Sequence, residues 1–154
     1  MTRHRNRLAL VVALLAGLGL AITAGASASA DPRTEYCNGE PTTGAATSGP
    51  DVIAGTAAGE LIQGLGGDDL ICARGGPDTV RGGPGSDRIF GQGGNDVING
   101  GDQGDTLFGE GGADTLNGGT GSDYTAGGPG ADRSNGGPGG DICLTEVIVA
   151  CEAN

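Results

Sequence analysis

The sequence predicts an all-β chain that coils on itself and stacks its short strands in parallel. Three observations carry this prediction: an acidic residue recurs at every ninth position from 51 to 141, a small or aliphatic residue stands two positions after each acid, and glycine fills most of the space before it. Residues 82–90, GGPGSDRIF, show all three features. A fixed short period is typical of chains whose repeats stack on one another. A disordered glycine-rich linker, which composition alone would favour, does not keep such a phase.

The residues after each acid predict a minimal strand. Residues 88–90 and 97–99 alternate outward, inward and outward, and only parallel stacking could bury Ile89 and Ile98. The glycines before the acid permit the positive φ angles of a tight turn. The expected inward column is Ile53, Ile62, Ile71, Val80, Ile89, Ile98, Leu107, Leu116, Thr125, Ser134 and Cys143.

The recurring acids predict a metal site. Stacking would bring successive carboxylates within about 4.8 Å of one another, where like charges repel by roughly 1–3 kcal/mol per pair. A cation between them turns repulsion into attraction, and a set of ligands made only of oxygen selects calcium. Because one aliphatic residue per repeat makes a thin core, we expect the chain to fold only as it binds metal. The predicted ligands are Asp51, Glu60, Asp69, Asp78, Asp87, Asp96, Asp105, Asp114, Asp123, Asp132 and Asp141.

The units resemble the haemolysin-type, or repeats-in-toxin (RTX), nonapeptide G-G-x-G-x-D-x-U-x, where U is a large aliphatic residue. Residues 82–90 match every defined position, and residues 118–126 match all but the aliphatic one, where Thr125 stands. The resemblance covers residues 46–144. It implies a right-handed parallel β-roll in which two nonapeptides make one coil of 18 residues, with calcium between the coils on both sides. The acids then form two ladders, of six and five rungs, with at most nine sites between turns.

Some units depart from this pattern. Glu60 is one methylene longer than aspartate, Ala73 and Arg74 replace the leading glycine pair of the third unit, and Gln103 replaces a turn glycine beside Asp102, a candidate extra ligand. Thr125 and Ser134 interrupt the aliphatic column. The best sites are therefore expected within residues 82–132.

The two ends predict an exported chain. Residues 1–30 read as a signal peptide, with an arginine-bearing head, an apolar run from residue 8 to about residue 24, and a small-residue cleavage site at residues 28–30. A membrane anchor is the alternative, which Gly17, Gly19 and the lack of a charged stop-transfer segment disfavour. We expect a lead-in or cap at residues 31–45, the roll at 46–144 and a C-terminal cap at 145–154, for which a sorting signal is the rival role. The alanine-rich signal, and arginine without lysine, resemble secreted proteins of GC-rich actinobacteria.

Four cysteines fit an oxidising compartment and allow three pairings. We favour disulfides Cys37–Cys72 and Cys143–Cys151, because each would then staple one end of the solenoid. Zinc is the rival use, but no C-x-x-C motif occurs.

Composition limits the function. The chain has 19 acidic residues against eight arginines, a balance that argues against nucleic acid and anionic membrane surfaces as partners. Residues 31–154 hold no histidine or lysine, and repeated acids share one environment, so we expect no enzyme. The predicted function is a secreted calcium-binding protein with no membrane insertion after signal cleavage. The alternative is a calcium-dependent adhesin or an extracellular-matrix or surface-layer component, with an extracellular polymer or a cell surface as partner.

Overall fold

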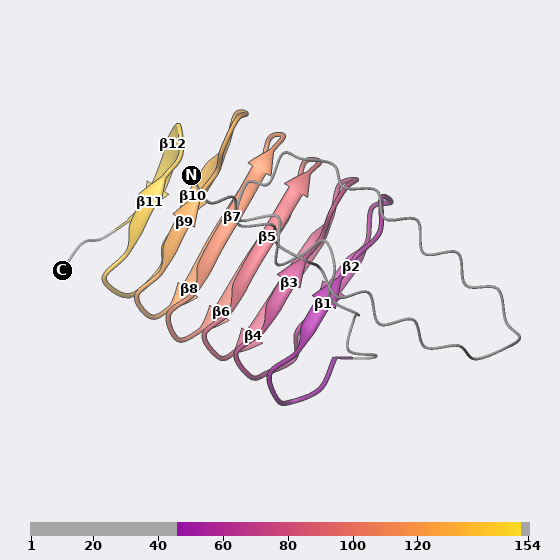
Figure 1. Ribbon diagram of the computed structural model, residues 1–154. Coiled ribbons are helices and arrows are strands. Elements are labelled where there is room, and N and C mark those ends of the chain that lie inside the picture. The colour runs from indigo at the N-terminus through magenta and orange to yellow at the C-terminus, as the bar shows by residue number, and fades with distance from the viewer. Residues whose placement is uncertain (1–45, 152–154) are drawn as a thin grey trace, which may run out of the picture.

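The computed structural model describes residues 46–151, which wind into a solenoid of two parallel six-stranded sheets (Figure 1). Odd-numbered strands pair only with odd-numbered strands and even-numbered with even-numbered, so each coil gives one strand to each sheet. Val52 pairs with Leu70, and Leu61 with Thr79, which sets a coil of 18 residues. The predicted all-β parallel solenoid is confirmed.

The strands of each sheet follow the order of the chain. Sheet A contains β1 (Val52–Ala54), β3 (Leu70–Cys72), β5 (Arg88–Gly93), β7 (Thr106–Gly111), β9 (Tyr124–Ala126) and β11 (Ile142–Leu144). Sheet B contains β2 (Leu61–Gln63), β4 (Thr79–Pro84), β6 (Val97–Asp102), β8 (Thr115–Thr120), β10 (Arg133–Asn135) and β12 (Val147–Ala150).

The middle strands are longer than the sequence predicts. Three-residue strands are found towards both ends of the solenoid, whereas β4 to β8 have six residues each. Their extra length is turn backbone that pairs with the next coil, as Gly83 does with Gly101. A Cβ at Gly101, where φ is 128°, would collide with the carbonyl oxygen of Gly83. Glycine therefore lets the turns, as well as the strands, stack in register.

The core is the predicted inward column. Ile71, Val80, Ile89, Ile98 and Leu107 are fully buried, and they pack together in one cluster along the axis of the solenoid. Where the aliphatic column breaks, Thr125 and Ser134 remain buried, and their hydroxyl groups hydrogen-bond to each other across the two sheets. Because the two buried hydroxyl groups are each other's hydrogen-bond partners, the inward column continues through Thr125 and Ser134 without an aliphatic residue.

The outer face of sheet A differs from the expectation of an exposed third strand residue. Phe90 is only 3 % exposed, although it points away from the axial core and belongs to a second cluster with Cys72. Its ring stacks on that of Phe108 at a centroid distance of 5.0 Å. We call the third residues after the acids in sheet A the outer apolar row: Ala54, Cys72, Phe90, Phe108, Ala126 and Leu144.

The C-terminal end carries a predicted disulfide. Cys143 and Cys151 are bonded, with their Cα atoms 6.1 Å apart, and residues 147–150 form β12, which pairs with β10. Cys72 is also disulfide-bonded. The expected signal peptide, the lead-in with Cys37, and residues 152–154 lie outside the described residues, so the pairing of Cys37 with Cys72 and the proposed domain limits stay predictions. Residues 46–151 contain no helix with the length and apolar character needed to cross a membrane.

Candidate metal centre

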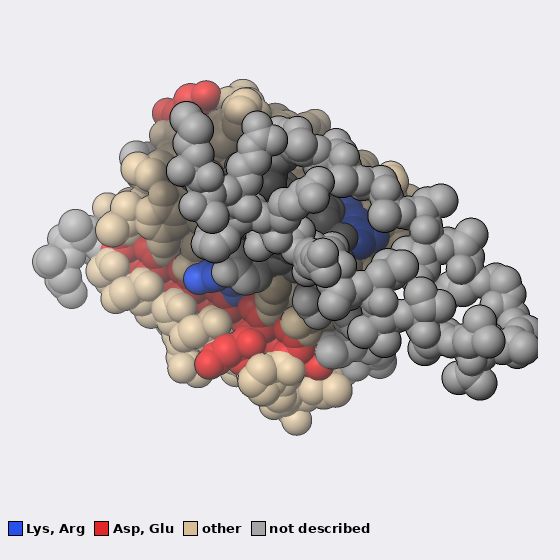
Figure 2. Space-filling model, in the orientation of Figure 1, with Lys and Arg blue, Asp and Glu red and all other residues tan. Residues whose placement is uncertain are grey.

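The predicted acids form two ladders, one along each sheet. Each acid directly precedes a strand, so the 18-residue register of the strands places the acids of one sheet in a row. Ten of the eleven are buried, whereas Glu60 is half-buried. Figure 2 shows acidic atoms in a band that runs across successive coils. Ladder A holds Asp51, Asp69, Asp87, Asp105, Asp123 and Asp141, and ladder B holds Glu60, Asp78, Asp96, Asp114 and Asp132.

Within a ladder every carboxylate after the first rung accepts a hydrogen bond from the preceding coil. The backbone N–H of Asp87 donates to Oδ1 of Asp105 at 2.8 Å, and that of Asp105 donates to Oδ1 of Asp123 at 2.8 Å. The same bond joins all the remaining pairs of neighbouring rungs in both ladders. These bonds fix the orientation of each carboxylate and leave its second oxygen, Oδ2, for another partner.

That second oxygen has no hydrogen-bond partner in nine of the acids. The nine Oδ2 atoms are buried, five in ladder A and four in ladder B, and their number equals the number of gaps between rungs. An ionised oxygen buried without a partner costs several kcal/mol, so it must gain a proton or a cation. The acids concerned are Asp69, Asp78, Asp87, Asp96, Asp105, Asp114, Asp123, Asp132 and Asp141.

A space beside eight of these nine oxygens is kept open by the leading glycine of the repeat. A Cβ at Gly100 would overlap Oδ2 of Asp105 and would lie 2.6 Å from the carbonyl oxygen of Gly118 on the next coil. The carboxylate and the carbonyl therefore face one space that a methyl group would fill. The same arrangement of both oxygens recurs at Gly64, Gly82, Gly91, Gly109 and Gly118.

Side chains alone do not complete an ion's coordination. Among residues 46–151, no three histidine, cysteine or acidic side chains come together closely enough to hold a metal. A cation in a gap would thus take carboxylate oxygens from the ladder and the rest from turn carbonyls and water. Such an all-oxygen donor set fits calcium, which accepts six to eight oxygen ligands in flexible geometry.

Burial raises the pKa of the carboxyl groups of the middle rungs. The pKa of Asp105 rises to about 7, and those of Asp87 and Asp114 rise to about 6. Desolvation is the largest cause; the hydrogen bond from the preceding rung lowers the pKa, and the neighbouring carboxylate raises it. Without an ion, Asp105 is therefore about half protonated at neutral pH, whereas Asp87 and Asp114 bind protons mainly below about pH 6.

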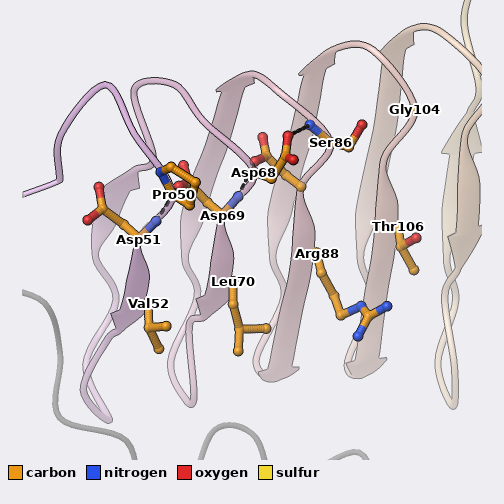
Figure 3. A pocket seen from close by; sticks show the side chains of 11 residues that line it. Pro50, Asp51, Val52, Asp68, Asp69, Leu70, Ser86, Arg88, Gly104 and Thr106 are labelled. Carbon is orange, nitrogen blue, oxygen red and sulfur yellow. Dashed lines mark hydrogen bonds between the residues drawn. The ribbon is translucent and has the colours of Figure 1, made fainter.

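Solvent reaches the first rungs of ladder A through a groove of about 520 Å³ (Figure 3). Asp51, Asp69 and Asp87 line it, together with the outward side chains of Leu70 and Arg88. Asp68 lies at the rim, where its Oδ1 accepts a hydrogen bond from the backbone N–H of Ser86.

The first coil satisfies its acids with protein donors instead. The backbone N–H of Thr47 donates to Oδ2 of Asp51 at 2.7 Å, and its hydroxyl donates to the same atom at 2.9 Å. Thr56 donates in the same way to both carboxylate oxygens of Glu60. These threonines stand four residues before the acid, a position at which the later units have glycine or another residue. Asp51 and Glu60 thus differ from the nine acids whose Oδ2 atoms have no hydrogen-bond partner.

The structure adds one acid that the nine-residue period misses. Glu146 directly precedes β12, as Asp132 directly precedes β10, and its Oε2 accepts the backbone N–H of Asp132 at 3.0 Å. It therefore stands at the end of ladder B, although only four residues lie between it and Asp141. An acid immediately before an apolar run was the signal that could have identified it.

Two of the irregular units alter their sites. Ala73 is fully buried in the position of the leading glycine, so a methyl group already occupies the space beside Asp78. Gln103 adopts a φ of 78° at a position where the other units from the third to the last have glycine. Asp102, the candidate extra ligand, is exposed and accepts a hydrogen bond from the hydroxyl of Thr120, away from the buried rungs.

Comparison with known proteins identifies the repeat. The model of the RTX calcium-binding nonapeptide repeat matches residues 46–80, 73–107, 90–124, 100–133 and 108–143. No curated protein and no solved structure matches the chain significantly. Since the family matches span residues 46–143, and the coil has the geometry that two nonapeptides imply, the protein belongs to the RTX calcium-binding nonapeptide repeat family.

Proposed function

We propose that this chain is a secreted calcium-binding protein whose roll folds as calcium binds between adjacent coils. The observation that carries the proposal is the set of nine buried Oδ2 atoms without a partner, five in ladder A and four in ladder B, as many as the ladders have gaps. Nine is therefore the upper limit on sites of this kind. The eleven repeat acids supply the carboxylates, with Asp51 and Glu60 as the terminal rungs.

The chain's own groups divide the work at each gap. The N–H of one rung holds Oδ1 of the next, which leaves Oδ2 directed into the space beside the leading glycine. The carbonyl oxygen of the next coil's leading glycine lies on the same space. A bound calcium ion supplies the positive charge that offsets the desolvation of the carboxylates and their mutual repulsion.

Calcium binding should be coupled to folding, because a roll without calcium would have a thin core and buried carboxylates without partners. Its core is one column of side chains, and nine buried carboxylates would have to be ionised without partners or carry protons. Binding energy is available only to the stacked state, because the unfolded chain does not place two coils side by side.

Secretion is supported by the predicted signal peptide at residues 1–30 and by the Cys143–Cys151 disulfide, which suits an oxidising compartment. We propose no catalytic role, because residues 46–151 lack histidine and lysine.

Calcium titration tests the proposal. Isothermal calorimetry should give a stoichiometry above four and no greater than about nine, with circular dichroism showing β-structure that appears over the same calcium range. Magnesium at equal concentration is the control, because Mg²⁺ demands regular octahedral geometry and loses its water reluctantly. Equal β content in excess EDTA and in millimolar calcium would contradict the coupling of folding to binding. An absence of calorimetric heat would contradict the calcium sites themselves.

A further inference from the structure

The outer faces of the two sheets differ in chemistry. The third residue after each acid points outward in both sheets, because strand side chains alternate and the inward column lies one residue earlier. In sheet A these residues form the outer apolar row. In sheet B they carry amides and one guanidinium, and no acid stands among them. We call them the amide row: Gln63, Arg81, Asn99, Asn117 and Asn135.

A second outward row runs beside the amide row. It stands one residue before the inward column, it also lacks acids, and it includes Thr79, Thr115 and Arg133. The two rows together place the guanidiniums of Arg81, on β4, and Arg133, on β10, on one face. Three strand spacings, roughly 14 Å, separate these two strands. Asp102 is the one acid within the strands of sheet B, and it lies beyond both rows at the turn end of β6.

The polar groups of this face are available to a partner. Within residues 46–151 no hydrogen bond or ion pair engages the side chains of Arg81, Asn99, Asn117 or Arg133. A hollow of about 190 Å³ lies on the face between β8 and β10, and Thr115, Arg133 and Asn135 line it. A hydroxyl, a guanidinium and an amide therefore meet at one place.

These groups suit a polysaccharide that carries carboxylates. An amide both donates and accepts hydrogen bonds, as a sugar hydroxyl does, and a guanidinium binds a carboxylate through two parallel hydrogen bonds. Two arginines roughly 14 Å apart match a polymer whose charges are widely spaced. Nucleic acid carries a charge about every 3.4 Å along each strand, and its unpaired bases stack on aromatic side chains, which both rows lack.

Calcium would remove the negative charge that repels such a polymer. Residues 46–151 hold fifteen acids and four arginines, a formal charge of −11, which six doubly charged calcium ions exceed. The acids that directly precede the strands of this face are those of ladder B, which lie in the proposed calcium sites. Once their charge is offset, the guanidiniums of Arg81 and Arg133 determine the sign of the potential over the face.

We propose that the outer face of sheet B, formed by the amide row with Thr79, Thr115 and Arg133, binds an acidic polysaccharide when calcium is bound. The arginines pair with its carboxylates, and the amides and hydroxyls bind its sugar hydroxyls. This inference rests on the proposed function, because it is the calcium-loaded roll that holds the two rows in register.

Binding of hyaluronate, a polymer that contains glucuronate, tests the face on the calcium-loaded protein. The parent should bind hyaluronate at least tenfold more tightly than dextran, an uncharged polysaccharide, and the affinity should fall as salt is added. The Arg81→Gln, Arg133→Gln variant should bind hyaluronate at least tenfold more weakly than the parent. The matched control is Arg74→Gln, Arg88→Gln, which removes the same charge outside sheet B and should change the affinity less than twofold.

A third variant tests the amides without a change of charge. Asn99→Ala, Asn117→Ala should lower the affinity for hyaluronate about three- to tenfold. Circular dichroism and calcium stoichiometry should match the parent in all three variants, because none of the substituted residues belongs to a ladder.

The outcomes separate this inference from the proposed function. Equal binding of hyaluronate and dextran by folded, calcium-loaded protein would overturn the inference alone, as would equal losses in the two arginine variants. Tighter binding of single-stranded DNA than of hyaluronate would assign the face to nucleic acid and overturn it. Self-association that is lost in the Arg81→Gln, Arg133→Gln variant would assign the face to a second copy, with the same result. A parent protein that binds no calcium would overturn both proposals.

Discussion

The first coil and the middle coils use the same repeat but satisfy their acids differently. In the first coil, Thr47 and Thr56 donate two hydrogen bonds each to Asp51 and Glu60. In the middle coils, no donor reaches Oδ2 of Asp87, Asp96 or Asp105, and the space beside that atom is left open by glycine. Protein donors thus satisfy the carboxylates of the first coil, whereas the carboxylates of the middle coils need a proton or a cation. We expect the two regions to respond differently to changes in metal, in pH and in sequence.

Removal of one middle carboxylate should have the largest effect. Asp105→Asn takes the charge from one gap and weakens the next, so the variant should lose one or two bound calcium ions. A broken buried charge network should lower the free energy of unfolding in calcium by about 3–5 kcal/mol. Calorimetric stoichiometry and thermal unfolding measure both quantities. The matched variant Asp51→Asn should bind nearly as many ions as the parent, and equal losses in the two variants would contradict the distinction between the regions.

Acid should partly replace calcium in the middle coils. The folded-state pKa of Asp105 is about 7 and those of Asp87 and Asp114 are about 6, all above the ordinary aspartate value of 3.8. The folded state therefore binds protons more tightly than the unfolded state, and this contribution to stability is complete below about pH 4 and is lost as pH rises through 6–7. Metal-free protein should show more β-structure at pH 4.5 than at pH 8, by circular dichroism. Protons should also compete with calcium, so calcium affinity should fall as the pH is lowered through 7 to 6. A metal-free β signal that grows with pH would reverse the predicted sign.

The residue at the leading position of each repeat should determine whether calcium binds at the adjacent site. Gly100→Ala puts a methyl group against Oδ2 of Asp105 and the carbonyl of Gly118, so about one calcium ion should be lost. The reciprocal variant Ala73→Gly opens the space beside Asp78 and should tighten calcium binding there. It should also destabilise the folded roll by about 1 kcal/mol, since a buried methyl group is lost. Calcium titration of both variants decides the matter, and a gain of affinity in Gly100→Ala would be inconsistent with an ion in that space.

The threonine donors of the first coil should give the smallest effect. Thr56→Val removes a hydroxyl that donates to Glu60, and a lost hydrogen bond of this kind costs about 1 kcal/mol. Calcium stoichiometry should not change, and faster amide exchange should be confined to the first coil. Thr115→Val, at an exposed outward position of β8, is the control and should leave exchange in the first coil unaltered. A reduced calcium stoichiometry in Thr56→Val would show that the first coil also depends on metal.

The period of the sequence predicted the register, the inward column and the two ladders because the same 18-residue spacing governs all three. The period could not predict the length of β4 to β8, since it does not say that turn backbone also pairs. It could not identify Glu146 either, because the last half-coil is shorter than nine residues. The burial of Phe90 was missed for another reason: alternation gives a side chain's direction relative to the core but not what lies beyond the sheet. Which residues bind calcium stays a prediction.

The direction of the ladder bonds has a consequence for how the molecule can grow. The N–H of each rung except Asp141 donates to the carboxylate of the next rung along the chain, so a coil is complete only when its C-terminal neighbour has been added. A chain that leaves a membrane pore with its N-terminus first would finish its coils one after another in the order of emergence. Truncation at the C-terminus would leave the N–H of a new last rung without its carboxylate acceptor. In the intact ladder B, Glu146 supplies that acceptor for Asp132.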